Sequence, residues 1–210
     1  MANILCIETA TIACSVALTK DGIVLSKKET TEKNAHSAKL TIFIDEVLKE
    51  NKLGFSDLDA IAVSKGPGSY TGLRIGVSTA KGLCYALDVP LIAINTLQSL
   101  AWGMAGSFSE KKHTSPLLCP MIDARRMEVY AAVFNFDLEE VRETKADIIE
   151  ADSFLEYLDE SQVIFFGDGA DKCKDIITHS NAVFVDDVFP SSANMAIPAN
   201  QKFIQKQFKD

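Results

Sequence analysis

The chain has 210 residues with 21 basic and 29 acidic side chains, so its formal net charge is −8. This acidic balance excludes a large basic surface for nucleic acid, because binding to the phosphate backbone needs clustered Lys and Arg. No apolar run approaches the ~20 residues of a membrane-spanning helix, and the first residues lack the basic start of a signal peptide. The five cysteines form no C-x-x-C pair, which is typical of a reducing compartment. We therefore expect a cytoplasmic protein that does not bind a membrane.

The first half of the chain alternates between strand and helix patterns. Asp21-Gly22 is typical of a two-residue hairpin turn, so the first strands are expected to form an antiparallel meander. Apolar residues at i, i+3, i+4, i+7 and i+8 predict an amphipathic helix after them, and the later strand–helix–strand units indicate a parallel part of the same sheet. In chain order we predict strands over 3–7, 13–19 and 23–28, a helix over 36–50, a strand over 60–64, a helix over 71–87, a strand over 91–95 and a helix over 96–104.

A polar segment over 105–115 predicts the boundary between two lobes, because it carries Gly, Ser, Lys and His between apolar patterns. The expected lobes are residues 1–104 and 105–210. In the second lobe we predict strands over 117–123, 128–136, 163–166 and 183–185, short helices over 152–159 and 170–177, and a helical tail from residue 195.

The two predicted lobes repeat one order of parts. Residues 4–8 and 119–123 each form an apolar strand that ends in an acid, and each lobe later has a strand that runs into glycines, at 66–68 and 167–169. Such an ordered repeat indicates a duplicated lobe, and glycine loops let backbone N–H groups approach phosphates. This is the layout of the α/β, two-lobed actin-like ATPase fold (ASKHA, ribonuclease H-like), with duplicated mixed-sheet lobes. The residues expected in a nucleotide cleft of this fold are Glu8, Thr9, Gly66, Gly68, Ser69, Asp123, Gly167 and Gly169.

The segment 66–82 is the most specific pattern in the chain. Its glycine spacing differs from that of a P-loop and from that of a dinucleotide-binding loop. Gly72, Gly76 and Ala80 recur every four residues, so small side chains line one face of the predicted helix. An interior glycine lowers helix stability by about 1 kcal/mol relative to Ala. We therefore expect close packing at these glycines to offset that cost. This pattern favours a close approach of the helices over 36–50 and 71–87 and a partner surface that they share, with packing inside the lobe as the alternative.

Four segments resemble the TsaB (YeaZ) family, which is related to the M22 glycoprotease grouping. They are residues 4–9, His36-Ser37, residues 66–82 and residues 123–130. The resemblance implies a non-catalytic subunit that is required for the transfer of a threonylcarbamoyl group to N6 of adenosine 37 in tRNA. It further implies that the chain binds and activates the catalytic subunit TsaD, that the ATPase TsaE joins them, and that tRNA is contacted only indirectly. A homodimer is expected when the partner is absent.

The resemblance places the TsaD contact on the first two helices of the first lobe. Ile42 lies off the core-facing side of its helix, and the alternative reading is a singly exposed apolar residue. The expected interface residues are Lys39, Ile42, Phe43, Glu46, Gly72, Arg74, Gly76, Val77, Ala80 and Lys81.

Two departures from the patterns of this wider family argue against catalysis. His36 is followed by Lys39 and Leu40 in place of a second histidine at H-x-x-x-H spacing, so no metal is expected. Glu8-Thr9-Ala10 replaces the usual Asp-Thr-Ser, which weakens the phosphate site, and we expect no cofactor and no catalytic residues. Arg125-Arg126, close after the acid at 123, is expected to form local ion pairs, with phosphate binding as the alternative.

Two other functions remain open from the sequence. One is an active small-molecule kinase or ATPase of the same fold, which would need an intact acid at the first phosphate loop. The other, less favoured, is an M22-type metallopeptidase, which would need the missing histidine.

Overall fold

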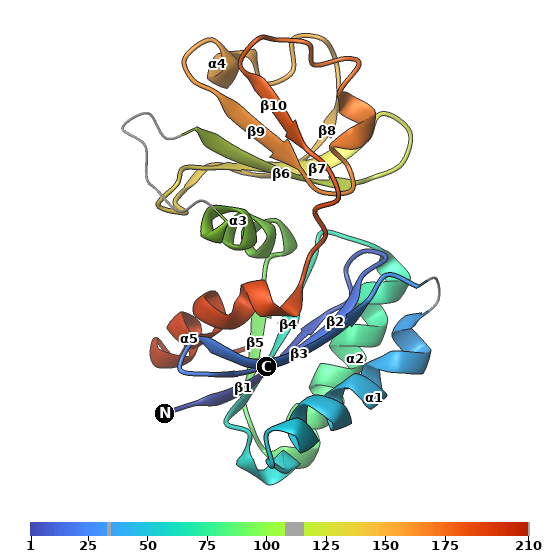
Figure 1. Ribbon diagram of the computed structural model, residues 1–210, viewed down its shortest axis with the longest axis vertical. Helices are drawn as coiled ribbons and strands as arrows, with labels where there is room; N and C mark the ends of the chain where they lie inside the picture. The colour runs from blue at the N-terminus through green and yellow to red at the C-terminus, as the bar shows by residue number, and fades with distance from the viewer. Residues whose placement is uncertain (33–34, 108–115, 210) are drawn as a thin grey trace. The chain divides into compact units, whose positions relative to one another are not determined.

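The computed structural model describes residues 1–32, 35–107 and 116–209 (Figure 1). It divides into two compact units, of which unit 1 comprises Met1–Ser99 with Pro190–Asp210 and unit 2 comprises Leu100–Phe189. In the described residues, no helix is both long enough and apolar enough to cross a lipid bilayer.

Unit 1 is a mixed sheet with helices on both faces. Its strands lie in the order β3-β2-β1-β4-β5, with β1 antiparallel to β2 and parallel to β4. The elements are β1 (Asn3–Glu8), β2 (Cys14–Lys20), β3 (Ile23–Thr30), α1 (Ala35–Glu50), η1 (Phe55–Asp57), β4 (Ala60–Ser64), α2 (Tyr70–Leu87), β5 (Leu91–Ile94), the start of α3 (Thr96–Gly106), η3 (Ser192–Met195) and α5 (Ala196–Ile204).

The central strand β1 is apolar from Ile4 to Ile7, in keeping with the cover on both of its faces. Leu5 and Ile7 belong to the core under α1 and α2. Ile4 and Cys6 point to the other face, where they join a core with Met195 and with residues of α5. α2 begins where the Ser69 side chain accepts a hydrogen bond from the N–H of Gly72, at 3.4 Å.

Unit 2 repeats this sheet order. Its strands run β10-β9-β6-β7-β8, so β6 takes the place of β1, with an antiparallel meander on one side and parallel strands on the other. The elements are the end of α3, β6 (Leu117–Asp123), β7 (Glu128–Phe134), β8 (Glu140–Ile148), α4 (Leu155–Leu158), β9 (Val163–Phe166), η2 (Asp171–Cys173) and β10 (Ala182–Val185). Phe165, between Phe154 and Phe184, forms the aromatic part of its core. The duplicated sheet confirms the actin-like ATPase fold that the repeat predicts.

The structure differs from the predicted elements in three places. β8 is a charged edge strand that the sequence pattern did not reveal, and the helix expected over 170–177 is only the short turn η2. The chain beyond residue 190 belongs to unit 1 rather than to a second lobe over 105–210, because α5 packs against β5 and β1. Most of the polar boundary expected over 105–115 lies outside the described residues.

Candidate functional site

Glu8 ends strand β1 and is fully buried. Its Oε1 accepts hydrogen bonds from the N–H of Ala10 and from the hydroxyl of Ser64, both at 2.7 Å, while its Oε2 has no partner in the described residues. Burial raises the pKa of Glu8 to about 7, although the hydrogen bonds from Ser64 and Ala10 act to lower it. Glu8 is therefore an enclosed carboxyl group, unlike an open acid that holds a hydrated metal ion.

The first glycine loop lies directly against the chain that follows Glu8. The N–H of Ser69 donates to the carbonyl of Ala10 at 2.6 Å, and a Cβ on Gly68 would lie 2.3 Å from that same carbonyl oxygen. Pro67 has no N–H, and the carbonyl of Gly66 accepts from the N–H of Thr96 at 3.0 Å. The N–H of Ser69 is therefore occupied by a hydrogen bond within the protein. A phosphate-binding loop would keep such a donor free for the phosphate.

Two of the small residues on α2, Gly72 and Gly76, lie against Thr9, which directly follows strand β1. A Cβ on Gly72 would lie 2.2 Å from the carbonyl oxygen of Thr9, and a Cβ on Gly76 would lie 2.2 Å from the Thr9 hydroxyl. Gly72, Gly76 and Ala80 are all buried. At Gly72 and Gly76 the structure shows packing on Thr9 inside the unit, which is the alternative to a partner surface, while the surface shared by α1 and α2 stays a prediction. α1 and α2 do contact each other.

Unit 2 has the same arrangement at the end of β6. A Cβ on Gly167 would lie 2.2 Å from the carbonyl oxygen of Met121, and a Cβ on Gly169 would lie 2.9 Å from the N of Asp123. Asp168 accepts a hydrogen bond from the N–H of Asp123 at 3.2 Å, and burial raises the pKa of this carboxyl above its ordinary value. The second glycine loop, residues 167–169, is therefore also packed directly on the end of a strand, here β6.

Lys172, in η2, holds Asp123. Its Nζ donates to Oδ1 of Asp123 and, at 2.7 Å each, to the carbonyls of Arg126 and Glu128. An ammonium group has three donors, so Lys172 uses all of them here. Lys172 supplies the positive charge that a hydrated cation would bring to Asp123, and sequence reasoning missed it because no motif marks it.

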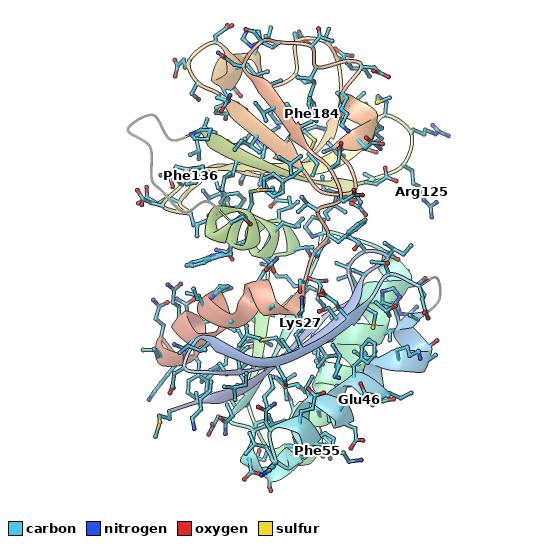
Figure 2. All side chains as sticks on the ribbon, in the orientation of Figure 1. Lys27, Glu46, Phe55, Arg125, Phe136 and Phe184 are labelled. Carbon is cyan, nitrogen blue, oxygen red and sulfur yellow. The ribbon has the colours of Figure 1, made fainter. Side chains whose placement is uncertain are left out.

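Arg125 and Arg126 form the turn between β6 and β7, and both have positive φ angles, of 71° and 46°. Their side chains are exposed, and Figure 2 labels Arg125 at the edge of unit 2. Neither guanidinium has an ion pair in the part of the chain that the structure describes. The local ion pairs expected from the sequence are therefore not formed there.

The outer faces of α1 and α2 carry the remaining interface candidates. Ile42 is 48% exposed, and Lys39, Arg74 and Lys81 are exposed as well. Tyr85, one turn beyond Lys81, is 93% exposed and was missed. Its spacing from Lys81 on a helix could have identified it, because residues four apart share a face. Of the other expected interface residues, Phe43, Glu46 and Val77 are partly buried.

No three His, Cys, Asp or Glu side chains gather as a metal site within residues 1–32, 35–107 and 116–209. His36 lies near the start of α1, and its Nε2 is buried without a hydrogen-bond partner in that part of the chain.

Comparison with known proteins identifies the family. A sequence model described as "TsaD: tRNA N6-adenosine threonylcarbamoyltransferase" matches residues 23–207. The chain is 35% identical over 170 residues to the "tRNA threonylcarbamoyladenosine biosynthesis protein TsaB" of Bacillus subtilis (strain 168), which covers 79% of this chain and 70% of that protein. This chain belongs to the TsaB family.

A second TsaB relative, from Escherichia coli (strain K12), is 36% identical over 135 residues. The match covers 64% of this chain and 56% of that protein, so it spans little more than half of the relative. The solved structure named "YeaZ from Pseudomonas aeruginosa" superposes with a TM-score of 0.81 at 23% identity, covering 100% of this chain and 96% of that one. At this identity the superposition shows the fold, and the resemblance to TsaB (YeaZ) drawn from the sequence is confirmed.

Proposed function

We propose that this TsaB-family chain is a non-catalytic subunit in the synthesis of threonylcarbamoyladenosine in tRNA. In this proposal it binds and activates TsaD, which transfers the threonylcarbamoyl group to N6 of the adenosine, and a TsaE-type ATPase joins the complex. The complex works on tRNA in the cytoplasm.

The observation that carries this proposal is the outer face of α1 and α2. Ile42 and Tyr85 expose apolar and aromatic surface to solvent, by 48% and 93% of their area. Aromatic residues and Arg are enriched at protein interfaces and supply most of their hot spots. Arg74, whose guanidinium lies 5.3 Å from the centre of the Tyr70 ring, adds a residue of this kind. We therefore assign the TsaD contact to this face.

The closed glycine loops support a non-catalytic role. The N–H of Ser69 is donated to Ala10, and the charge of Asp123 is matched by Lys172. A phosphate site needs free backbone N–H donors, and a carboxylate that holds a metal ion must be open to that ion. The kinase alternative therefore has no observation in its favour here.

The test is binding to TsaD together with reconstituted tRNA modification. Ile42→Glu places a charge on the proposed contact, and an unpaired buried charge should lower affinity by about 2–5 kcal/mol. Ile42→Glu should lose TsaD binding and the modification that depends on it, while its melting temperature stays unchanged.

The matched control is Ile197→Glu, because Ile197 on α5 is 46% exposed and the change is identical. Ile197→Glu should bind TsaD as the parent does. If Ile42→Glu also binds normally, the interface lies elsewhere. If modification proceeds equally well without this chain, the proposed function is wrong.

A further inference from the structure

The turn between β6 and β7 presents three exposed side chains in succession. Arg125, Arg126 and Met127 are all exposed, and Met127 exposes 37% of its area. Figure 2 shows Arg125 at the outer edge of unit 2. Arg and Met are both enriched at protein interfaces relative to the rest of the protein surface. The turn therefore carries side chains that are typical of a contact with another protein.

The backbone of this turn is fixed at three consecutive carbonyls. The carbonyl of Arg125 accepts a hydrogen bond from an N–H of β7 at 3.1 Å, which closes the turn. The carbonyl of Arg126 accepts from Nζ of Lys172 at 2.7 Å, and that of Met127 accepts from the N–H of Ile149 at 2.9 Å. Bonds from three separate segments thus hold the turn in one shape, and its side chains project from a fixed base.

The two arginines stand at backbone positions that suit other residues better. Their φ angles are 71° for Arg125 and 46° for Arg126. Gly and Asn adopt positive φ readily, whereas a residue with a long side chain rarely does so and lowers the stability of the fold. Backbone strain of this kind is concentrated at binding and catalytic sites. The strain at Arg125 and Arg126 therefore indicates that their side chains have a role other than folding.

Neither guanidinium is paired within residues 1–32, 35–107 and 116–209, although a carboxylate lies beside them. Oδ1 of Asp123 accepts from the backbone N–H of Arg125 at 3.0 Å, and the same carboxylate pairs with Lys172. Asp123 is thus engaged without pairing either guanidinium. By contrast, a carboxylate lies within 4.0 Å of every other Lys and Arg that the structure describes in unit 2, namely Arg142, Lys145, Lys172 and Lys174. The two unpaired guanidinium groups are therefore available to a group from outside the described chain.

The turn suits the carboxylates of a protein better than phosphate. Small ligands such as nucleotides bind in concave pockets, whereas three exposed side chains in succession form a projecting tip. Nucleic acid needs more cations than two, and the remaining basic side chains of unit 2 that the structure describes are paired. Guanidinium groups pair with carboxylates through two parallel hydrogen bonds, and Arg is common among the residues that dominate binding energy. The geometry thus favours a protein surface that carries Asp or Glu side chains.

We propose that Arg125 and Arg126 bind a pair of carboxylates on a partner protein, with Met127 packed at the rim of the contact. Because the turn is already fixed, less conformational freedom is lost on binding. This contact lies in unit 2, whereas the proposed TsaD contact on α1 and α2 lies in unit 1, so the two surfaces are separate. The proposal deepens the proposed function and rests on it for the choice of TsaD and the TsaE-type ATPase as test proteins.

The experiment measures binding of the full chain to TsaD alone, and to TsaD together with the TsaE-type ATPase, by surface plasmon resonance across a salt series. Arg125→Asn/Arg126→Gly removes both guanidinium groups and supplies residues that accept positive φ. This double variant should weaken binding at least about tenfold in one of the two arms and should flatten the salt dependence there. Arg125→Lys/Arg126→Lys keeps both charges but loses the planar donors. It should keep the salt dependence and still bind more weakly than the parent.

Thermal unfolding separates a binding role from a structural one. Arg125→Asn/Arg126→Gly should melt about 2–4 °C above the parent, because it relieves backbone strain. Two arginines that served only the fold would lower the melting temperature when removed. The matched control is Lys206→Gly, because Lys206 is an exposed cation with a positive φ of 55°, just after α5 in unit 1. Lys206→Gly should also melt above the parent and should bind in both arms as the parent does.

The proposal is overturned if Arg125→Asn/Arg126→Gly binds in both arms as tightly as the parent, or if its binding and its melting temperature fall together. It is also overturned if the parent binds tRNA in a fluorescence anisotropy assay and this variant does not, because the turn then contacts nucleic acid. These outcomes leave the proposed function standing, since Ile42→Glu and the modification assay test it separately. A chain that binds through this turn but is dispensable for modification would refute the proposed function only, and a parent that binds in neither arm would refute both.

Discussion

The carbonyl oxygen of Thr9 lies 2.2 Å from the point where a Cβ on Gly72 would stand. Helix α2 therefore packs against the chain that follows β1, with no room for a side chain at position 72. The contact joins the first glycine loop, its helix and the end of the central strand into one packed group. This packing gives the glycines of α2 a structural role that differs from one position to the next.

Gly72→Ala should destabilise the protein. The added methyl group meets backbone, which cannot rotate away, and overpacking of this kind typically costs about 1–3 kcal/mol. A gain of up to about 1 kcal/mol in helix propensity offsets part of this loss. Gly82→Ala is the control on the same helix, because nothing lies within 4 Å of its Cβ position, and it should be neutral or stabilising. Thermal and urea unfolding measure both variants, and equal stability of the two would contradict the packing described here.

Glu8 should make the protein less stable as the pH rises. Its pKa is about 7 in the folded chain, above the ordinary value of 4.5 that the unfolded chain keeps. Below about pH 4.5 both states are protonated and there is no penalty. Between about pH 4.5 and 7 the unfolded state loses its proton first, so the free energy of unfolding falls with pH and then levels off. At about 1.4 kcal/mol for each tenfold change in proton affinity, the loss is at most about 3.5 kcal/mol.

Glu8→Gln removes this titration while keeping an acceptor for Ser64 and Ala10. The difference in unfolding free energy between Glu8→Gln and the parent should therefore shift in favour of the variant from pH 5 to pH 8. Glu32→Gln, an exposed change, should show no such trend. A constant difference between Glu8→Gln and the parent across this range would show that Glu8 is not held neutral.

Much of the fold could be predicted because both sheets repeat one order of apolar strands. The helices over 36–50 and 71–87 agree with α1 and α2 to within one residue at each end. β8 escaped prediction because an edge strand needs no apolar run, and its charges protect an exposed edge. Arg142 and Asp147 on β8 pair with each other, so two of the charges of this strand have partners in the folded chain.

The site was harder to predict than the fold. The periodicity of Gly72 and Gly76 correctly indicates a face that must be approached closely, but periodicity cannot say that Thr9 approaches it. The contact between Lys172 and Asp123 spans 49 residues and ends on backbone carbonyls, which have no sequence signature. Pairings of this kind are set by the tertiary fold. They decide whether a carboxylate already has an ion-pair partner or remains available to a ligand.

The isolated chain should not bind ATP with micromolar affinity. The N–H of Ser69, which a phosphate would need, is donated to the carbonyl of Ala10. Calorimetry with ATP and Mg²⁺ measures this directly. Micromolar binding, with hydrolysis that Asp123→Asn abolishes, would restore the kinase or ATPase reading.

Lys172→Met should loosen the turn between β6 and β7. The change removes the donor from Asp123 and leaves the carbonyls of Arg126 and Glu128 without it, so a loss of about 1–3 kcal/mol is expected. Hydrogen exchange should quicken at the amides of residues 124 and 128, whose hydrogen bonds close this turn. Lys174→Met is the control, because its ammonium pairs with exposed carboxylates nearby and does not reach the turn. If the two variants exchange these amides at the same rate as the parent, then Lys172 has no structural role in this turn, and Asp123 is free to take a cation.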